Sequence, residues 1–109
     1  MNELSFLFYL SPDREDRLRV VAQKERGRIL GFLVQYEARI RDRWVAIVRY
    51  DTTHGFAHRD VLHPDGSQDK QPLHFLDQNI AFTYAIQDLK MLWRWYREGF
   101  EGEMPDDKR

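Results

Sequence analysis

Cysteine is absent from the 109 residues of this sequence. Its absence excludes disulfides, thiolate nucleophiles and cysteine-ligated zinc sites, and it fits the reducing cytoplasm, where we expect the protein to reside. A membrane-spanning run is also missing, because the apolar stretch at residues 4–10 is only about a third of the length that crosses a bilayer. Glu3 precedes this stretch in place of a basic segment, so we expect no signal peptide and no membrane partner.

An excess of charge is missing as well, since 17 basic and 18 acidic residues give a formal net charge of -1. No global electrostatic field therefore draws the protein to nucleic acid or to an anionic membrane. Glycine-rich phosphate-binding loops and the Gly-x-Ser-x-Gly nucleophile motif do not occur either. These absences argue against nucleotide-loop enzymes and serine hydrolases.

Apolar residues, in contrast, make up 42% of the chain and include three tryptophans. A chain of this length and composition can bury one core without a metal or a disulfide. We therefore expect a single domain over residues 1–100. The charged segment 101–109 contains Gly102 and Pro105 and is predicted to be a flexible tail.

Four stretches in the middle of the chain have the pattern of β-strands. Residues 29–40 alternate between apolar and polar side chains, which predicts a strand with one buried face. Residues 44–50 are apolar at nearly every position and predict a strand inside the sheet with both faces covered. A short run at 57–62 follows, and the polar run 68–73 contains Pro72, which is typical of an edge strand. The short turns between these runs indicate an antiparallel meander.

Two N-terminal segments leave alternatives open. Residues 4–10 fit either an edge strand or a clamp across the core. Residues 12–26 begin like a helix, since Ser11 can cap and Pro12 suits a first turn, but the alternation around Leu18 has the period of a strand. We favour the strand, because a hairpin into the next run then needs no extra loop.

Beyond Asp77 the apolar period changes to that of a helix, predicted over residues 78–99. One apolar stripe would pack on the sheet: Phe82, Ile86, Leu89, Trp93, Tyr96 and Phe100. The expected fold is therefore α+β, an antiparallel meander sheet of four or five strands with one long C-terminal helix packed across it. A second stripe of the same helix, Tyr84, Met91 and Trp95, is a candidate face for a protein partner.

Polar residues that can carry chemistry gather between residues 49 and 63, where three of the four histidines lie. The candidate catalytic residues are Arg49, Asp51, His54, His58 and Asp60. Two residues apart on one strand, Arg49 and Asp51 share a face, and so do His58 and Asp60. The hairpin register decides whether the pairs meet.

Two registers of this hairpin remain open. An even-numbered loop can place Asp51 opposite Phe56 and Arg49 opposite His58. A loop centred on His54 places Arg49 opposite Arg59 instead.

If the pairs meet, the residues suit metal-independent cleavage of RNA. His58 or His54 would act as general acid or base, an aspartate would orient it, and Arg49 would clamp the phosphate. In the structural alternative Asp51 and Thr52 cap the turn, Arg49 pairs with Asp60, and His58 is an ordinary residue of the sheet surface.

A metal-binding alternative would use His54, His58, Asp60 and His63 as ligands. No established zinc pattern matches their spacing, so we expect no metal and no cofactor.

The stretch Arg49-Tyr50-Asp51-Thr52-Thr53-His54-Gly55-Phe56-Ala57-His58 resembles a family of small uncharacterised prokaryotic proteins, defined by an Arg-Tyr-Asp-Thr-x-His-Gly-x-x-His core. More distantly, its Arg-Tyr-Asp strand end followed by Gly and His is similar to the TumE-type toxins of bacterial toxin–antitoxin modules. That resemblance implies a small toxin-like protein, an RNA substrate and a small protein partner. The alternative from a different class is a non-enzymatic interaction module, antitoxin-like or phage-encoded, that binds through the Tyr84, Met91 and Trp95 face and through a β edge.

Overall fold

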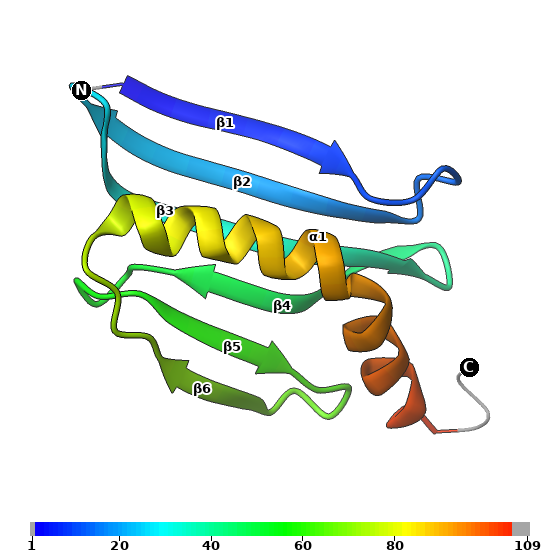
Figure 1. The fold of residues 1–109 in the computed structure, drawn as a ribbon. Helices are drawn as coiled ribbons and strands as arrows, with labels where there is room; N and C mark the ends of the chain where they lie inside the picture. Colours follow the sequence, from blue (N-terminus) through cyan, green and yellow to red (C-terminus); the bar gives the residue numbers. More distant parts are fainter. Residues whose placement is uncertain (1, 106–109) are drawn as a thin grey trace.

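Short turns fold the first 72 residues into an antiparallel meander, and the remaining chain crosses it as one helix (Figure 1). The computed structural model describes residues 2–105. Its single sheet has six strands in the order β1-β2-β3-β4-β5-β6. The elements are β1 (Asn2–Tyr9), β2 (Asp16–Glu25), β3 (Arg28–Ile40), β4 (Arg43–Asp51), β5 (His58–Leu62), β6 (Gln68–Pro72) and α1 (Gln78–Gly102). Within the described range no helix is long and apolar enough to span a bilayer.

Positive backbone angles close the tightest turns. At the β3–β4 corner, Arg41 and Asp42 have φ values of 55° and 63°, and at the β2–β3 corner Arg26 and Gly27 have 51° and 78°. Two-residue loops with both residues in this region match the right-handed twist of the flanking strands. The meander predicted from the turn residues is therefore confirmed.

The sheet has six strands rather than the four or five predicted, because β1 joins it along its whole length. Asn2 pairs with Lys24 at one end of β1, and Tyr9 pairs with Arg17 at the other. Residues 16–25 form a strand, as favoured from the sequence. The helix-like start at Ser11 is instead a turn, in which the Ser11 hydroxyl donates to Asp13 and accepts from the Glu15 amide, at 2.6 and 3.2 Å.

Within residues 2–105 no strand pairs with the outer edge of β1. All eight residues of β1 are exposed, although the strand is rich in apolar side chains. Leu4, Phe6, Leu7, Phe8 and Tyr9 each keep about two-fifths of their surface accessible. The opposite edge strand, β6, is also exposed but polar, as predicted for residues 68–73.

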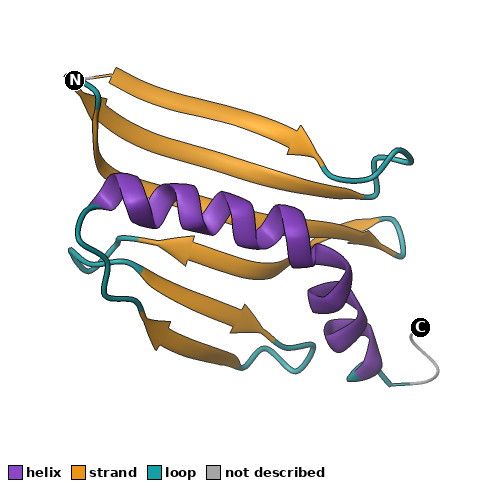
Figure 2. Ribbon diagram, viewed as in Figure 1, coloured by secondary structure: helices purple, strands orange, loops and turns teal. Residues whose placement is uncertain are grey.

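Helix α1 begins where Asp77 caps it, since the Asp77 carboxylate accepts a hydrogen bond of 2.9 Å from the Ile80 amide. The helix lies across the middle of the sheet, over β3 and β4 (Figure 2). It continues past Gly99 to Gly102, so the first two residues of the predicted tail are helical. Residues 106–109 of that tail lie outside the described part of the chain.

The buried stripe of α1 consists of Ala81, Ala85, Leu89, Trp93, Tyr96 and Phe100. The predicted stripe is thus confirmed from Leu89 onward. Phe82 and Ile86 are only partly buried and pack beside the two alanines, which lie against the sheet. The helix covers one face of the central strands, where Leu18, Val34 and Val48 are fully buried.

The other face of the sheet has no second layer among the described residues. The prediction that both faces of residues 44–50 are covered is therefore wrong for β4. Long polar side chains lie on this face instead, and the Arg17 guanidinium stacks 3.7 Å from the centre of the Trp44 ring. The functional candidates of β4 and β5 lie on the same uncovered face.

Candidate functional site

The β4–β5 pairing brings four of the predicted catalytic residues to one face of the sheet. Asp51 pairs with His58, and Arg49 pairs with Asp60. Directly paired residues of antiparallel strands project to the same side. Between them, Tyr50 and Arg59 project to the opposite side, toward α1, where both lie near Asp88.

Neither register predicted for this hairpin is correct. The connection comprises residues 52–57, an even number of residues. Arg49 and Asp51 therefore lie on the same face as His58 and Asp60, as the register with an even-numbered loop predicted. Asp51, however, lies opposite His58 rather than Phe56. The pairing is displaced by two residues because Asp51 and His58 themselves still belong to the strands.

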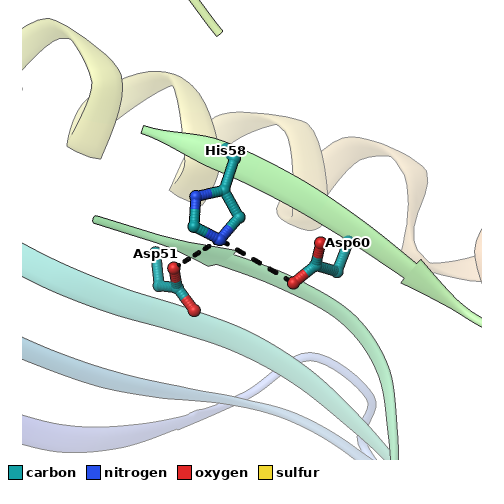
Figure 3. A group of neighbouring side chains, drawn as sticks. All are labelled: Asp51, His58 and Asp60. Atoms are coloured by element: carbon teal, nitrogen blue, oxygen red, sulfur yellow. Dashed lines mark ion pairs between the residues drawn. The ribbon is translucent and has the colours of Figure 1, made fainter. Parts of the chain in front are cut away.

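Asp51, His58 and Asp60 form a compact cluster in which both carboxylates face the same ring nitrogen (Figure 3). His58 Nε2 lies 2.7 Å from Asp51 Oδ1 and 3.9 Å from Asp60 Oδ2. The first distance is a hydrogen bond, whereas the second is too long for one. Because an ionised carboxylate only accepts hydrogen bonds, Nε2 carries a proton in the pair with Asp51.

The cluster is buried although no further layer of the described residues covers this face. Asp51, His58 and Asp60 are 8%, 2% and 3% exposed, respectively. The rings of His54 and Phe56, from the connecting loop, lie 5.6 and 6.1 Å from the His58 ring. The structural alternative supposed that His58 is an ordinary residue of the sheet surface. Its burial shows that it is not.

Asp51 also has the turn-stabilising role of that alternative. Its Oδ1 accepts a hydrogen bond of 3.2 Å from the Thr53 amide, in addition to the bond from His58. One carboxylate oxygen thus links the end of β4, the loop and the imidazole.

Two buried polar atoms of the cluster have no hydrogen-bond partner: His58 Nδ1 and Asp60 Oδ1. Asp60 Oδ1 does form an ion pair with Lys70 Nζ, at 3.4 Å, whereas no ion pair or hydrogen bond within residues 2–105 reaches His58 Nδ1. Leaving a buried polar atom unpaired costs about 1–3 kcal/mol, so such atoms in a folded protein need an explanation. Here they lie at the residues that the sequence singles out.

Arg49 extends the cluster into a polar row across the sheet. Its Nε donates a hydrogen bond of 2.7 Å to Gln35, whose amide donates at 2.7 Å to Glu37. Although Arg49 and Asp60 are register partners, their side chains form no ion pair within residues 2–105, contrary to the structural alternative. Gln35 was missed from the sequence, although its place two residues before Glu37 puts both on one strand face.

Glu37 anchors the far end of this row. Burial alone would raise the pKa of its carboxyl, but hydrogen bonds from Arg19, Arg17 and Gln35 hold that pKa below its usual value. Arg17 Nε and Arg19 Nε lie 2.7 and 2.9 Å from Glu37. The uncovered face therefore carries five charged or polar side chains that hydrogen bonds already hold in place: Arg17, Arg19, Gln35, Glu37 and Arg49.

The four residues of the predicted metal-binding alternative are not brought together. His63 lies apart from the cluster and contacts Asp69 and Glu103, at 2.8 and 2.9 Å. His54 is exposed and stacks on His58. Instead, Asp51, His58 and Asp60 offer one ligand atom each, with these atoms within 4.8 Å of one another, and among residues 2–105 this is the group that could hold a metal ion.

A shallow pocket adjoins the cluster at Asp51. Gln23, Gly31, Thr52 and Thr53 contribute to its walls. Gly31 leaves room for the loop, because a Cβ at this position would lie 3.1 Å from Thr52 Oγ1. The same hydroxyl oxygen accepts a hydrogen bond of 2.9 Å from the Phe32 amide, which fixes the start of the loop.

The predicted partner face lies on the other side of the molecule. Tyr84, Met91 and Trp95 are 43%, 74% and 67% exposed on α1. Asp88 lies between them in sequence but projects inward and accepts hydrogen bonds from Tyr50 and Tyr96, at 2.6 and 2.7 Å. The candidate catalytic residues thus lie on the sheet face that α1 does not cover, whereas the candidate partner face lies on the solvent side of α1.

Comparisons with known proteins agree with the uncharacterised family expected from the motif. The search of curated proteins and the search of solved structures each gave no match. A family model described as "Domain of unknown function (DUF7718)" matches residues 1–105, which is nearly the whole chain. The chain therefore belongs to this family of uncharacterised domains.

Proposed function

We propose that this protein is a toxin-like ribonuclease that cleaves RNA with the Asp51–His58 pair and without a metal. The observation that supports the proposal is the unpartnered Nδ1 of His58, on the opposite side of the ring from Asp51. In a neutral ring whose Nε2 donates to a carboxylate, Nδ1 is bare and basic. A carboxylate that fixes the tautomer of a catalytic histidine is a recurrent arrangement in hydrolytic enzymes.

The reaction needs only groups of this chain and the RNA. His58 Nδ1 takes the proton of a ribose 2′-hydroxyl, and the 2′ oxygen attacks the adjacent phosphorus. The bond from phosphorus to the 5′ oxygen breaks, and that oxygen takes a proton back from the ring. The products are a 2′,3′-cyclic phosphate and a 5′-hydroxyl. Asp51 stabilises the imidazolium that exists between the two proton transfers.

Arg49 is placed to bind the phosphate. Only its Nε is engaged, by Gln35, and its two Nη groups make no hydrogen bond within residues 2–105. These two groups can donate side by side to two phosphate oxygens. Gln35 would hold the guanidinium in that orientation.

The loop between β4 and β5 would control access to the base. His54 and Phe56 lie against the His58 ring, and His58 is almost fully buried. RNA can therefore reach Nδ1 only when residues 53–56 shift. His54 would then contact the RNA rather than act as the base.

The proposal is tested by incubating end-labelled single-stranded RNA with the protein in the presence of EDTA. We expect cleavage with cyclic-phosphate ends, and none of a matched strand made of 2′-deoxynucleotides. His58→Ala should lower the rate by about 10²–10⁴-fold, the usual contribution of a general base. Arg49→Lys should also be impaired, because a point charge does not replace the planar fork.

Asp51→Asn tests the pair without removing volume, and His63→Gln is the matched control outside the site. Equal cleavage by wild type and by folded His58→Ala would refute the role of His58. Absence of cleavage by the wild type would favour the second candidate function, a protein-interaction module. That alternative is supported by the high exposure of Met91 and Trp95 on the helix.

A further inference from the structure

We propose that Asp51, His58 and Asp60 form a binding site for one divalent transition-metal ion, of which Zn²⁺ is the representative. The ion would be held by His58 Nε2 and by one oxygen of each carboxylate. The binding stands independently of the reaction proposed above. Its consequence for activity rests on that proposed function.

The donor set is of the kind that zinc takes. An imidazole nitrogen and carboxylate oxygens bind Zn²⁺ at about 2.0–2.2 Å. A tetrahedral ion therefore holds two such donors about 3.4 Å apart. The 3.9 Å between His58 Nε2 and Asp60 Oδ2 would have to shorten by about 0.5 Å, which a side-chain rotation can supply. The 2.7 Å between His58 Nε2 and Asp51 Oδ1 is a direct hydrogen bond and would have to lengthen when an ion inserts.

Burial and charge both favour a cation at this place. Two carboxylates flank one imidazole, and all three residues are at least nine-tenths buried. Lys70 Nζ forms an ion pair of 3.4 Å with Asp60 Oδ1, but the lysine side chain is 45% exposed and Oδ1 accepts no hydrogen bond. A buried carboxylate is costly unless it is paired or coordinates a metal. A divalent ion would compensate both aspartates at once.

The backbone already holds the three ligands in place. Asp51 and His58 are a directly paired rung of β4 and β5, and Asp60 lies two residues further along the same face. Binding would therefore require side-chain rotation rather than rearrangement of the sheet. Asp51 also borders the shallow pocket beside Thr52 and Thr53, which gives an ion a route from solvent.

The ion and the proposed reaction would use the imidazole in incompatible ways. Metal ligation by Nε2 removes the hydrogen bond through which Asp51 orients His58 for catalysis. We therefore expect Zn²⁺ to inhibit RNA cleavage and EDTA to restore it. This makes the cluster a point at which metal availability can regulate the enzyme.

Binding is tested by isothermal titration of EDTA-treated protein with ZnCl₂. We expect one ion per chain, with an affinity at least ten-fold weaker in Asp60→Asn and in Asp51→Asn. His63→Gln is the matched control, because it removes the other histidine that contacts two carboxylates. Unchanged affinity in both folded aspartate variants, or loss of binding in His63→Gln, would overturn the site.

A measurement on the unmutated chain covers the case in which the aspartate variants do not fold. In protein labelled with ¹⁵N-histidine, addition of ZnCl₂ should shift Nε2 of His58 and leave the nitrogens of His63 unchanged. Histidine signals that do not respond to an excess of Zn²⁺ would overturn the proposal. The His58 signal is identified as the one that persists in His54→Gln, His63→Gln and His74→Gln.

The two proposals fail separately. Cleavage in EDTA together with no binding of Zn²⁺ would retain the ribonuclease and refute the metal site. Binding of Zn²⁺ without any RNA cleavage would retain the metal site and refute the ribonuclease. Cleavage that is stimulated by Zn²⁺ would retain the site but overturn the expected inhibition.

Discussion

At the scale of single residues, His63 shows how one side chain can join two distant parts of the chain. It follows β5, and its ring nitrogens contact Asp69, at the start of β6, and Glu103, at the end of α1. Both partners are carboxylates, so both nitrogens donate when the ring is protonated. Hydrogen bonds to Glu103 and Asp69 accordingly raise the pKa of His63.

The raised pKa of His63 predicts a pH-dependent contribution to stability. A group whose pKa is higher in the folded state stabilises the fold fully below its unfolded pKa, about 6.5. That contribution is lost as the pH rises through the higher folded pKa. The melting temperature of wild type should therefore exceed that of His63→Gln more at pH 6 than at pH 9.

Glu103→Gln provides the control for this measurement, because it removes one of the two carboxylates that contact His63 and keeps the imidazole. This variant should reproduce part of the change with pH. A difference between wild type and His63→Gln that is the same at both pH values would contradict the prediction.

The sequence correctly predicted which residues of each strand share a face, because side chains alternate along a strand. It did not predict which residues of the two strands lie opposite each other. Arg49, Asp51, His58 and Asp60 share a face, because alternation along a strand fixes the side of each residue. That Asp51 lies opposite His58 depends on where the strands end. The bonds that fix the loop, such as that from the Phe32 amide to Thr52, come from a strand distant in sequence.

At the scale of elements, α1 is held to the sheet by apolar packing and by buried polar contacts. Tyr50 of β4 and Tyr96 of α1 both donate to Asp88, so the helix and the strand share one carboxylate. Burial and the hydrogen bond to Asp88 raise the pKa of Tyr96 to about 12. The phenol therefore remains protonated, and able to donate, at physiological pH.

Leu89 tests the packing of α1 directly. The side chain is fully buried at the centre of the helix. Leu89→Ala should lower the free energy of unfolding by about 2–5 kcal/mol, the range for large-to-small changes in a core. Chemical denaturation measures this change.

Met91, two residues later on the same helix, is the matched control because it is 74% exposed. Met91→Ala should change the stability by less than about 0.5 kcal/mol, as surface substitutions do. Equal losses in the two variants would mean that the helix does not pack through this stripe.

The helix itself was more predictable than its exact contacts. Its period and its start at Asp77 follow from local sequence, and the stripe from Leu89 onward is correct. Ala81 and Ala85 escaped notice because alanine gives only a weak apolar signal. Their small side chains allow close approach to the sheet, which depends on the tertiary structure.

At the scale of the whole molecule, the sheet-plus-helix arrangement was predictable, but the number of strands and the coverage of the sheet were not. The segment around Leu7 pairs fully with β2 and adds the extra strand. An apolar run does not by itself show whether it becomes an edge or an inner strand. Similarly, residues 44–50 look doubly buried, yet polar side chains such as Gln35 and Glu37 take the place of a second layer.

The two ends of the sheet differ in a way that affects how the protein behaves in concentrated solution. The β6 edge is polar, but β1 presents an open backbone edge together with apolar side chains. Such an edge is a template for adding further strands and promotes aggregation.

Leu7→Glu should therefore reduce light scattering at high protein concentration, and the new carboxylate would face Arg19 across the strand pair. Met91→Glu makes the same change of charge away from the edge, so equal protection by both variants would attribute the effect to charge alone. In colloidal terms, the first strand sets the concentration at which this small protein remains dispersed.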